Sequence, residues 1–485
     1  MATNDETMVE RESAPPNVPD LLRVSPMDTT TATDVETSMT DPVVISESFC
    51  RFTLLNKGIL HSHSKITLAL ENPDANDRFF PPNVGVSSLI QRAALKVGTK
   101  TLQEIDGYNF LTAYKSLFIS NEHQKQREQV QSGRCISHEF LTDDTATTSG
   151  GYENDTQAEG YGLSNGKEYD DTFGSVHRDL EVNDWANIKN SPVFQIALSD
   201  LFPMLKQTQL PLYMMKEQVS IELTFEPKLG IGRACSASGV ATANYSIDTT
   251  QVKFIADYIY YPQEMMDAYA EQNRVITINH FDYRHSKVSV SSTTAGSTQI
   301  RNLGGANRIV TKVITGLQSD GADDKCILNQ YHAMVPEVNY VGGSTAGENG
   351  STTYNIKYND RFLYPVDVVN SARHFHNTAQ AEGVPPMVTR EEYSAEGTAL
   401  TNKKFMGYVQ NQGTKAGATT GAGLLGRFGW AGFRLNRNER VNSRGLEIYY
   451  KYLSLSTEAA YTQRSWIELA KLTTLVDGYV QTQLA

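Results

Sequence analysis

Residues 251–285 constrain the fold of this chain more than any other stretch. They read as a strand that ends at Pro262, a short helix over 263–272, and a second strand that begins near Val275. Roughly 215 residues of strand-rich and loop-rich sequence lie on each side of this unit, a size at which single β domains are common. Two β domains in tandem, joined by a helical linker, point to a building block more than to a catalyst.

Alternating apolar and polar residues predict strands with one buried face. Residues 219–226 place Val219, Ile221, Leu223 and Phe225 on one side and the polar residues between them on the other, a pattern typical of antiparallel sheets. Three more segments read as strands from alternation or β-branched content. They are 65–71, 308–314 and 446–452.

Helical patterns are few. Apolar residues at three-to-four spacing predict a helix within 106–118, and 263–272 is the other candidate. Residues 465–474 fit a helix or a strand, because periodicity does not decide between them. Long polar connections at 141–184, 341–353 and 411–424 separate the strands. Many short strands with such loops favour an all-β fold of two sandwiches.

Composition narrows the class of protein. The chain of 485 residues carries a net charge of −12, which argues against sequence-specific nucleic-acid binding, since phosphate neutralisation needs clustered Lys and Arg. No apolar run approaches the roughly 18 residues that span a bilayer, and the N-terminus has no secretory pattern. The four cysteines are scattered without a CxxC pair, so we expect neither a disulfide framework nor a zinc knuckle.

The first 45 residues differ from the rest. They hold nine acidic and two basic residues, and the first aromatic residue of the chain is Phe49. Such a segment buries too little apolar area to offset its ordering entropy, so we predict a disordered acidic N-terminal arm over 1–45. The alternative is an arm that becomes ordered on a neighbouring subunit.

Three segments, in this order, resemble the double jelly-roll major capsid proteins of polinton-like viruses, virophages and large eukaryotic DNA viruses. The first is a strand with a Gly98 turn and an Ile105-Asp106 pair that leads into an aromatic helix. The second is the Leu-Pro-Leu sequence at 210–212 before a long alternating strand. The third is the linker at 257–272, and matching elements span roughly 45–285. No single motif is specific, so the resemblance rests on the order of the three motifs and on the two equal β halves.

The resemblance implies a fold and a role. The fold is all-β, with two tandem jelly-roll β-sandwiches (a double jelly roll), a few short helices and long loops. The implied domains are a first jelly roll at 46–262, a linker helix at 263–272 and a second jelly roll at 273–485. The implied role is a non-enzymatic major capsid protein that forms homotrimers, pseudo-hexameric capsomers and an icosahedral virion shell around a DNA genome. Its partners would be further copies of itself and penton and minor capsid proteins, with an internal membrane left open.

Short motifs for cofactors and catalysis are weak. His61-Ser-His63 and His374-Phe-His376 would place two imidazoles on one face of a strand, as in metal-binding cupins, but the following Glu residues are badly spaced. A GxGxxG match at 421–426 lacks the strand and helix that a dinucleotide site needs. No P-loop, GxSxG or HExxH motif occurs, so we predict no catalytic residues, no metal and no cofactor.

One basic cluster is a candidate inter-subunit contact, because Arg pairs well with carboxylates at interfaces. Ordinary exposed arginines explain it equally well. It consists of Arg427, Arg434, Arg437, Arg440 and Arg444.

Two other functions stay open. A metal-binding bicupin-like enzyme would use one of the His-x-His pairs. A lectin-like glycan-binding fibre or adhesin would use some of the 24 tyrosines, because lectins also use jelly rolls. The lectin-like alternative does not account for the linker segment.

Overall fold

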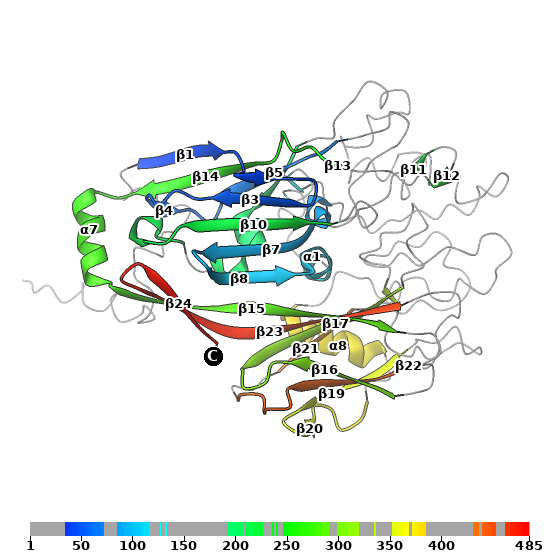
Figure 1. Cartoon of the computed structure of the whole chain (residues 1–485). Coiled ribbons are helices and arrows are strands. Elements are labelled where there is room, and N and C mark those ends of the chain that lie inside the picture. The colour runs from blue at the N-terminus through cyan, green and yellow to red at the C-terminus, as the bar shows by residue number, and fades with distance from the viewer. Residues whose placement is uncertain are drawn as a thin grey trace, which may run out of the picture.

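The computed structural model describes most of the chain outside its long connections. Short gaps fall at 207–208, 368–370 and 436–438, and a few isolated residues are described in the regions between the main ranges. The main ranges are 34–71, 85–116, 193–226, 246–290, 298–319, 352–384, 430–452 and 461–484. The strands in them form two β-sandwiches, one above the other in Figure 1.

The first sandwich pairs two sheets, which we call sheet A and sheet B. Sheet A has the order β1-β14-β5-β9, with β4 also beside β14. Sheet B has the order β2-β3-β10-β7-β8. The strands of sheet A are β1 (Asp34–Thr40), β4 (Ile59–Leu60), β5 (Lys65–Leu68), β9 (Phe194–Ala197) and β14 (Lys253–Tyr260). Those of sheet B are β2 (Val44–Ile45), β3 (Phe49–Thr53), β7 (Ile90–Val97), β8 (Lys100–Asp106) and β10 (Val219–Phe225).

The alternation in β10 packs as its sequence predicts. Val219, Ile221, Leu223 and Phe225 are all buried, and they lie in the core that fills the space between the two sheets. Phe52 of β3 meets Phe254 of β14 across that core, with ring centroids 5.8 Å apart. Ser220 lies on the opposite side of β10 from Ile221 and is buried as well, so the prediction that this side is open to water is wrong at this residue.

The second sandwich has the same plan, with sheets that we call C and D. Sheet C has the order β15-β23-β17-β18, in which β21 also pairs with β17 and β24 with β23; sheet D has the order β16-β22-β19-β20. The strands of sheet C are β15 (Val275–Val290), β17 (Val310–Ser319), β18 (Met334–Val335), β21 (Trp430–Arg434), β23 (Tyr461–Val476) and β24 (Tyr479–Leu484). Those of sheet D are β16 (Thr298–Gly304), β19 (Thr352–Tyr358), β20 (Arg361–Phe362) and β22 (Leu446–Tyr452).

A second core lies between sheets C and D. Tyr354 of β19 contacts Phe433 of β21 edge to face, with ring centroids 4.9 Å apart. The buried hydroxyl of Tyr450 is hydrogen-bonded to Thr315, and Gln463 Nε2 donates to the same hydroxyl at 2.9 Å. Because every described polar atom of this trio has a partner, the buried hydroxyls cost little. Residues 465–474, ambiguous in sequence, lie within the long strand β23.

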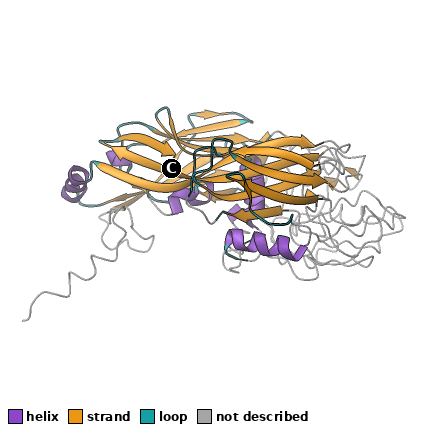
Figure 2. Ribbon diagram, turned by 90° about the horizontal axis from the view of Figure 1, so that it is seen from below, coloured by secondary structure: helices purple, strands orange, loops and turns teal. Residues whose placement is uncertain are grey.

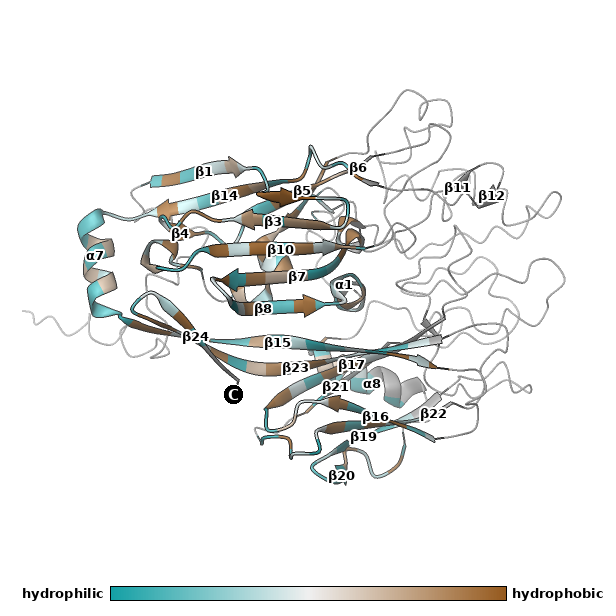
Figure 3. Cartoon of the chain, viewed as in Figure 1, coloured by the Kyte–Doolittle hydropathy of each residue, from teal (hydrophilic) through white to brown (hydrophobic). Residues whose placement is uncertain are grey.

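Helices and short pairings complete the fold. α7 (Gln263–Gln272) leaves the end of β14 and leads into β15 at one end of the molecule, where Figure 2 shows it apart from the sheets. It is largely hydrophilic in Figure 3, and Met266 is its buried residue. The remaining helices are η2 (Gly85–Leu89), α1 (Tyr108–Ser116), α6 (Leu198–Leu201), η5 (Pro203–Lys206), η6 (Leu212–Met214) and α8 (Ser371–Glu382). The short pairs are β6 (Leu70–Glu71) with β13 (Ser246–Ile247), and β11 (Cys235–Ser236) with β12 (Gly239–Val240).

The prediction of a disordered arm over 1–45 is wrong for its last part. Residues 34–40 form β1, which pairs with β14 over its whole length, and Val44 and Ile45 form β2. Backbone hydrogen bonds and polar pairs hold β1, for example Lys57 Nζ to Glu36 Oε1 at 2.5 Å. The sequence-based prediction considered only how much apolar area the segment could bury, so it missed the backbone hydrogen bonds between β1 and β14. Residues 1–33 lie outside the described residues, as do the connections 141–184 and 411–424 and most of 341–353.

The first prediction concerns the β10 pattern. Leu223→Ala should lower the free energy of unfolding by about 2–5 kcal/mol, because it leaves a cavity in a closed core. Thr224→Ala, one residue on and partly exposed, should change it by about 0.5 kcal/mol or less. Urea unfolding of both variants would measure this, and equal losses would contradict the inward placement of Leu223.

Candidate functional site: the junction between the two sandwiches

Two sheet edges meet where the sandwiches join. β8 is the last strand of sheet B, and β15 is the first strand of sheet C; Figure 1 shows them side by side. No backbone ladder is formed between them among the described strands. Because an open edge leaves backbone groups unpaired, side chains must satisfy them.

Gln103 and Lys471 supply such contacts. The buried side chain of Gln103 donates from Nε2 to the carbonyl of Phe281 at 2.6 Å and accepts the backbone N–H of Met204 at 3.2 Å. From the second sandwich, Lys471 Nζ lies 3.1 Å from Asp282 Oδ2 and donates to the carbonyl of Thr101 at 3.2 Å. Each edge therefore receives a side-chain hydrogen bond from the other sandwich.

The turn after β8 is the tightest point of the junction. Gly107 has φ +65°, and a Cβ there would lie 2.9 Å from the ring of Trp466 and 3.1 Å from His285. Trp466 is fully buried and donates from Nε1 to the carbonyl of Asp106 at 2.9 Å. Its ring stacks on His285, with centroids 4.5 Å apart. Glycine is thus required by both the backbone conformation and the close approach.

The side chain of Asp106 also stabilises this turn. Oδ2 lies 3.1 Å from His285 Nδ1, and this hydrogen bond lowers the pKa of Asp106, although burial opposes the shift. A carboxylate only accepts hydrogen bonds, so Nδ1 of His285 carries the proton. The Ile105-Asp106 pair, singled out in the sequence, therefore lies at the junction.

Helix α1 carries a polar cluster across the junction. Lys115 Nζ donates to the hydroxyl of Tyr283 at 3.0 Å, and that hydroxyl donates to Glu468 Oε2 at 2.7 Å. Thr311 Oγ1 donates to the other oxygen of Glu468 at 2.7 Å. Burial lowers the pKa of Lys115 to about 8, while burial and the neighbouring Glu468 raise that of Tyr283 well above its usual value.

Helix α8 closes the far end of this region. Lys312 Nζ lies 2.9 Å from both carboxylate oxygens of Glu382, and both side chains are mostly buried. Gly432 of β21 donates its N–H to Thr378 Oγ1 at 3.3 Å, and a Cβ at Gly432 would collide with the hydroxyl of Tyr114. Helix α1 of the first sandwich and α8 of the second thus both reach β21.

One apolar core runs through the junction. The core of the first sandwich includes residues of the second, which come from β15, β17, β23 and β24. They are Ile276, Ile278, Ile314, Trp466, Leu475 and Val480. Burial of this kind holds the two units together, since the hydrophobic contribution grows with the area removed from water. The junction can therefore act mechanically, as a rigid joint.

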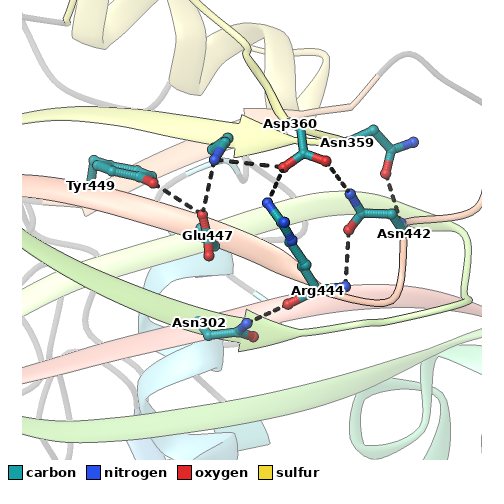
Figure 4. A network of polar contacts seen from close by, with 8 residues as sticks. Asn302, Asn359, Asp360, Asn442, Arg444, Glu447 and Tyr449 are labelled. Atoms are coloured by element: carbon teal, nitrogen blue, oxygen red, sulfur yellow. Dashed lines mark hydrogen bonds and ion pairs between the residues drawn. The ribbon is translucent and has the colours of Figure 1, made fainter.

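The structure scatters the predicted arginines. Arg434 ends β21, and Arg440 and Arg444 precede β22; all three are exposed. Arg444 pairs with Asp360 at 3.0 Å within the surface network of Figure 4, where its carbonyl also accepts a hydrogen bond from Asn302. Arg427 and Arg437 lie outside the described residues.

The histidine pairs are not alike. His61 and His63 follow β4, with ring centroids 4.9 Å apart, and burial lowers the pKa of His61. His374 and His376 lie on helix α8, so the prediction that alternation places them on one strand face is wrong. Among the described residues, no three His, Cys, Asp or Glu side chains form a metal-binding group. The GxGxxG match at 421–426 is not described.

No helix in the described part of the chain is long and apolar enough to cross a membrane. No curated protein sequence matches the chain. Residues 45–262 match the family described as the major capsid protein N-terminus.

Solved structures share the whole fold. The Sputnik virophage structure matches with 12% identity and a TM-score of 0.55, covering 100% of this chain and 93% of that chain. The mavirus major capsid protein matches with 10% identity and a TM-score of 0.53, covering 100% and 95%. The PBCV-1 Vp54 structure matches with 10% identity and a TM-score of 0.51, covering 93% and 97%.

The first sandwich therefore matches major capsid proteins in sequence, and the whole chain has the double jelly-roll fold. The two sandwiches are the two jelly rolls of this fold. The family resemblance that the sequence motifs indicated is thereby confirmed.

Sequence reasoning missed the residues that join the two jelly rolls. Trp466 lay in the stretch that was ambiguous between helix and strand, and His285 is a single histidine without a motif. Gly107 was the one sequence feature that could have pointed to this junction, since a glycine between a strand and a helix often has a positive φ and marks a tight turn. Its partner is 359 positions away in the chain, and no local pattern gives that contact.

The second prediction tests the close approach at Gly107. Gly107→Ala and Gly383→Ala both place a side chain at positive φ, but nothing lies within 4 Å of a Cβ at Gly383. Gly383→Ala should cost about 1–2 kcal/mol of unfolding free energy. Gly107→Ala should cost roughly 1–3 kcal/mol more, from overpacking against Trp466. Urea unfolding would compare them, and equal costs would refute a tight joint.

The third prediction concerns pH. Between about pH 8 and the usual pKa of Lys near 10.4, the folded Lys115 amine is neutral while the unfolded one stays protonated. The unfolding free energy of the wild type should therefore rise over this range, relative to Lys115→Met, by about 3 kcal/mol. Below about pH 8 the difference should be constant.

The measurement is urea unfolding of both proteins at several pH values. Lys206→Met is the control, because the Lys206 side chain is 56% exposed. If the control alters the pH profile as much as Lys115→Met does, burial of Lys115 is not the cause.

Proposed function

We propose that this major capsid protein trimerises into pseudo-hexameric capsomers, and that these tile an icosahedral virion shell around a DNA genome. The observation that carries the proposal is the continuous core between the two jelly rolls. A shell subunit must transmit load between neighbours without bending, and closely packed interiors resist deformation. Two rolls fixed in this way form one block with two similar halves.

The shape of the block supports a trimer. Two similar jelly rolls per chain give six in a closed threefold ring, which would fill a hexagonal outline. Closed cyclic symmetry uses the same contact in every copy, so each favourable residue pair counts three times in a trimer.

The domains of the proposal are the N-terminal arm over 1–45, the rolls at 46–262 and 273–485, and the linker helix between them. The arm now includes the ordered strands β1 and β2.

The partners of the proposal are further copies of this chain, penton proteins and minor capsid proteins in the virion. The role is structural and not enzymatic. The predicted arginines remain candidate inter-subunit contacts in this proposal. Arg434, Arg440 and Arg444 are exposed, and Arg444 already pairs with Asp360.

The fourth prediction is the native mass. Light scattering of purified full-length protein should give a species of three 53.8-kDa chains or larger shells, and negative-stain images of the same fractions should show hexagonal blocks. A stable monomer over the full range of concentration and salt would overturn the capsomer and return attention to the enzyme and lectin alternatives.

A further inference from the structure

One histidine lies among the contacts that hold the two rolls together. His280 of β15 is 4% exposed, and it lies directly opposite Lys471 of β23 in the ladder. Residues opposite each other in a ladder share a face of the sheet, so the imidazole and the ammonium group are neighbours. From this face Lys471 reaches Thr101 of β8, the strand beside β15 in Figure 1. His280 is therefore a buried titratable group at the joint.

The hydrogen bonds of His280 fit a neutral ring. Nδ1 lies 3.3 Å from the carbonyl oxygen of Phe281, and Nε2 lies 2.9 Å from Thr473 Oγ1. A carbonyl only accepts hydrogen bonds, so Nδ1 carries the proton and Nε2 accepts from the buried hydroxyl of Thr473. A second proton on the ring would make Nε2 a donor, and the hydroxyl of Thr473 would then need another acceptor.

Two hydrogen bonds that cross the junction involve the immediate neighbours of His280. The carbonyl of Phe281 that His280 contacts also accepts the hydrogen bond from Gln103 Nε2 of the first roll, at 2.6 Å. Lys471, opposite His280, donates to the carbonyl of Thr101 at 3.2 Å. A change of charge on His280 would therefore act on both of these bonds between the rolls.

The charges around His280 balance only while its ring is neutral. Lys471 Nζ lies 3.1 Å from Asp282 Oδ2, so one ammonium group faces one carboxylate. An imidazolium would add a positive charge without a carboxylate to a buried site, where unpaired charge is costly. Burial lowers the pKa of His280, and Lys471 lowers it further, while the hydrogen bond to Phe281 and the charge of Asp282 oppose the shift.

Other charged groups on the elements beside β15 have partners of their own. Glu104 of β8 pairs with Arg92 at 2.6 Å, and Lys100 of β8 donates to a carbonyl of β24 at 2.5 Å. Lys206 of η5 lies 3.5 Å from Asp200. None of these described groups supplies His280 with a second carboxylate.

We propose that the joint between the two rolls is an acid-sensitive switch, which weakens when His280 takes up a proton. A histidine whose pKa is lower in the folded protein binds more protons after unfolding, so acid favours opening. The stability that depends on neutral His280 is complete above its usual pKa near 6.5, and it is lost as the pH falls through the lower pKa of the folded ring. Acid alone would then make a rigid subunit compliant, and this regulation acts within one chain, beyond the proposed capsomer.

The test is hydrogen–deuterium exchange of the full-length protein, measured by mass spectrometry on peptides from β8 and β15. Corrected for intrinsic exchange, the protection of these peptides should fall between about pH 7.5 and 5.5 by up to roughly tenfold per pH unit, since opening takes up one proton. His280→Gln stays neutral at every pH, so it should remove most of this fall.

His61→Gln is the matched control. His61 is also buried, and burial lowers its pKa, but it follows β4 in the first roll. This variant should keep the wild-type pH dependence at β8 and β15.

Lys471→Met is a second variant, which gives an answer even if His280→Gln does not fold. It removes the positive charge opposite the ring, so the pKa of folded His280 should move back toward its usual value. The fall in protection on acidification should then shrink, whatever the overall protection of the variant.

The outcomes separate this switch from the capsomer. An equal pH dependence in the wild type, His280→Gln and Lys471→Met would overturn the switch, and so would its loss in His61→Gln. Light scattering at neutral pH tests the capsomer alone. A monomeric wild type that still shows the His280-dependent fall would overturn the capsomer and support the switch.

Discussion

The structure depends on two strand edges that protect each other. The core of the first sandwich continues into the second, and β8 and β15 would both present unpaired backbone groups if the sandwiches were apart. Gln103 and Lys471 each donate a hydrogen bond to a backbone carbonyl across the junction. Trp466 packs against the turn at Gly107 and donates a hydrogen bond to the carbonyl of Asp106. An open edge invites pairing with other chains, and burying it against the second sandwich removes that hazard. The rest of the fold can then be built from short strands and long connections.

Polar groups fix how the two rolls sit. The Lys115–Tyr283 and Asp106–His285 hydrogen bonds join the two rolls, so they exist only while the rolls keep their placement. Sliding one roll past the other would leave the mostly buried side chains of Lys115 and His285 without these partners, at a cost of about 1–3 kcal/mol for each. The apolar core supplies most of the attraction, and the polar groups select one geometry from the many that hydrophobic contact alone would permit.

Sequence patterns gave the strands and the linker helix, because alternation and helical spacing are local properties. The pattern at 219–226 became β10, and α7 has the bounds 263–272. The junction was not predictable in the same way. Trp466 and Asp106 are 360 residues apart, and β1 is held by a backbone ladder that a polar, acidic sequence conceals. Residues 374–376 read as a strand pair by motif, but they belong to a helix whose Glu382 anchors it to Lys312.

The long separation between Asp106 and Trp466 has a consequence for synthesis. A ribosome adds roughly 5–20 residues per second, so the turn at Gly107 leaves the ribosome about 20–70 s before the tryptophan that covers it. During that interval the β8 edge and the nascent core of the first roll are exposed. Because β15 is made midway through this interval, the edge gains partial cover first, and only the last strands complete it. The joint that makes the finished subunit stiff is therefore also the last part of it that translation can close.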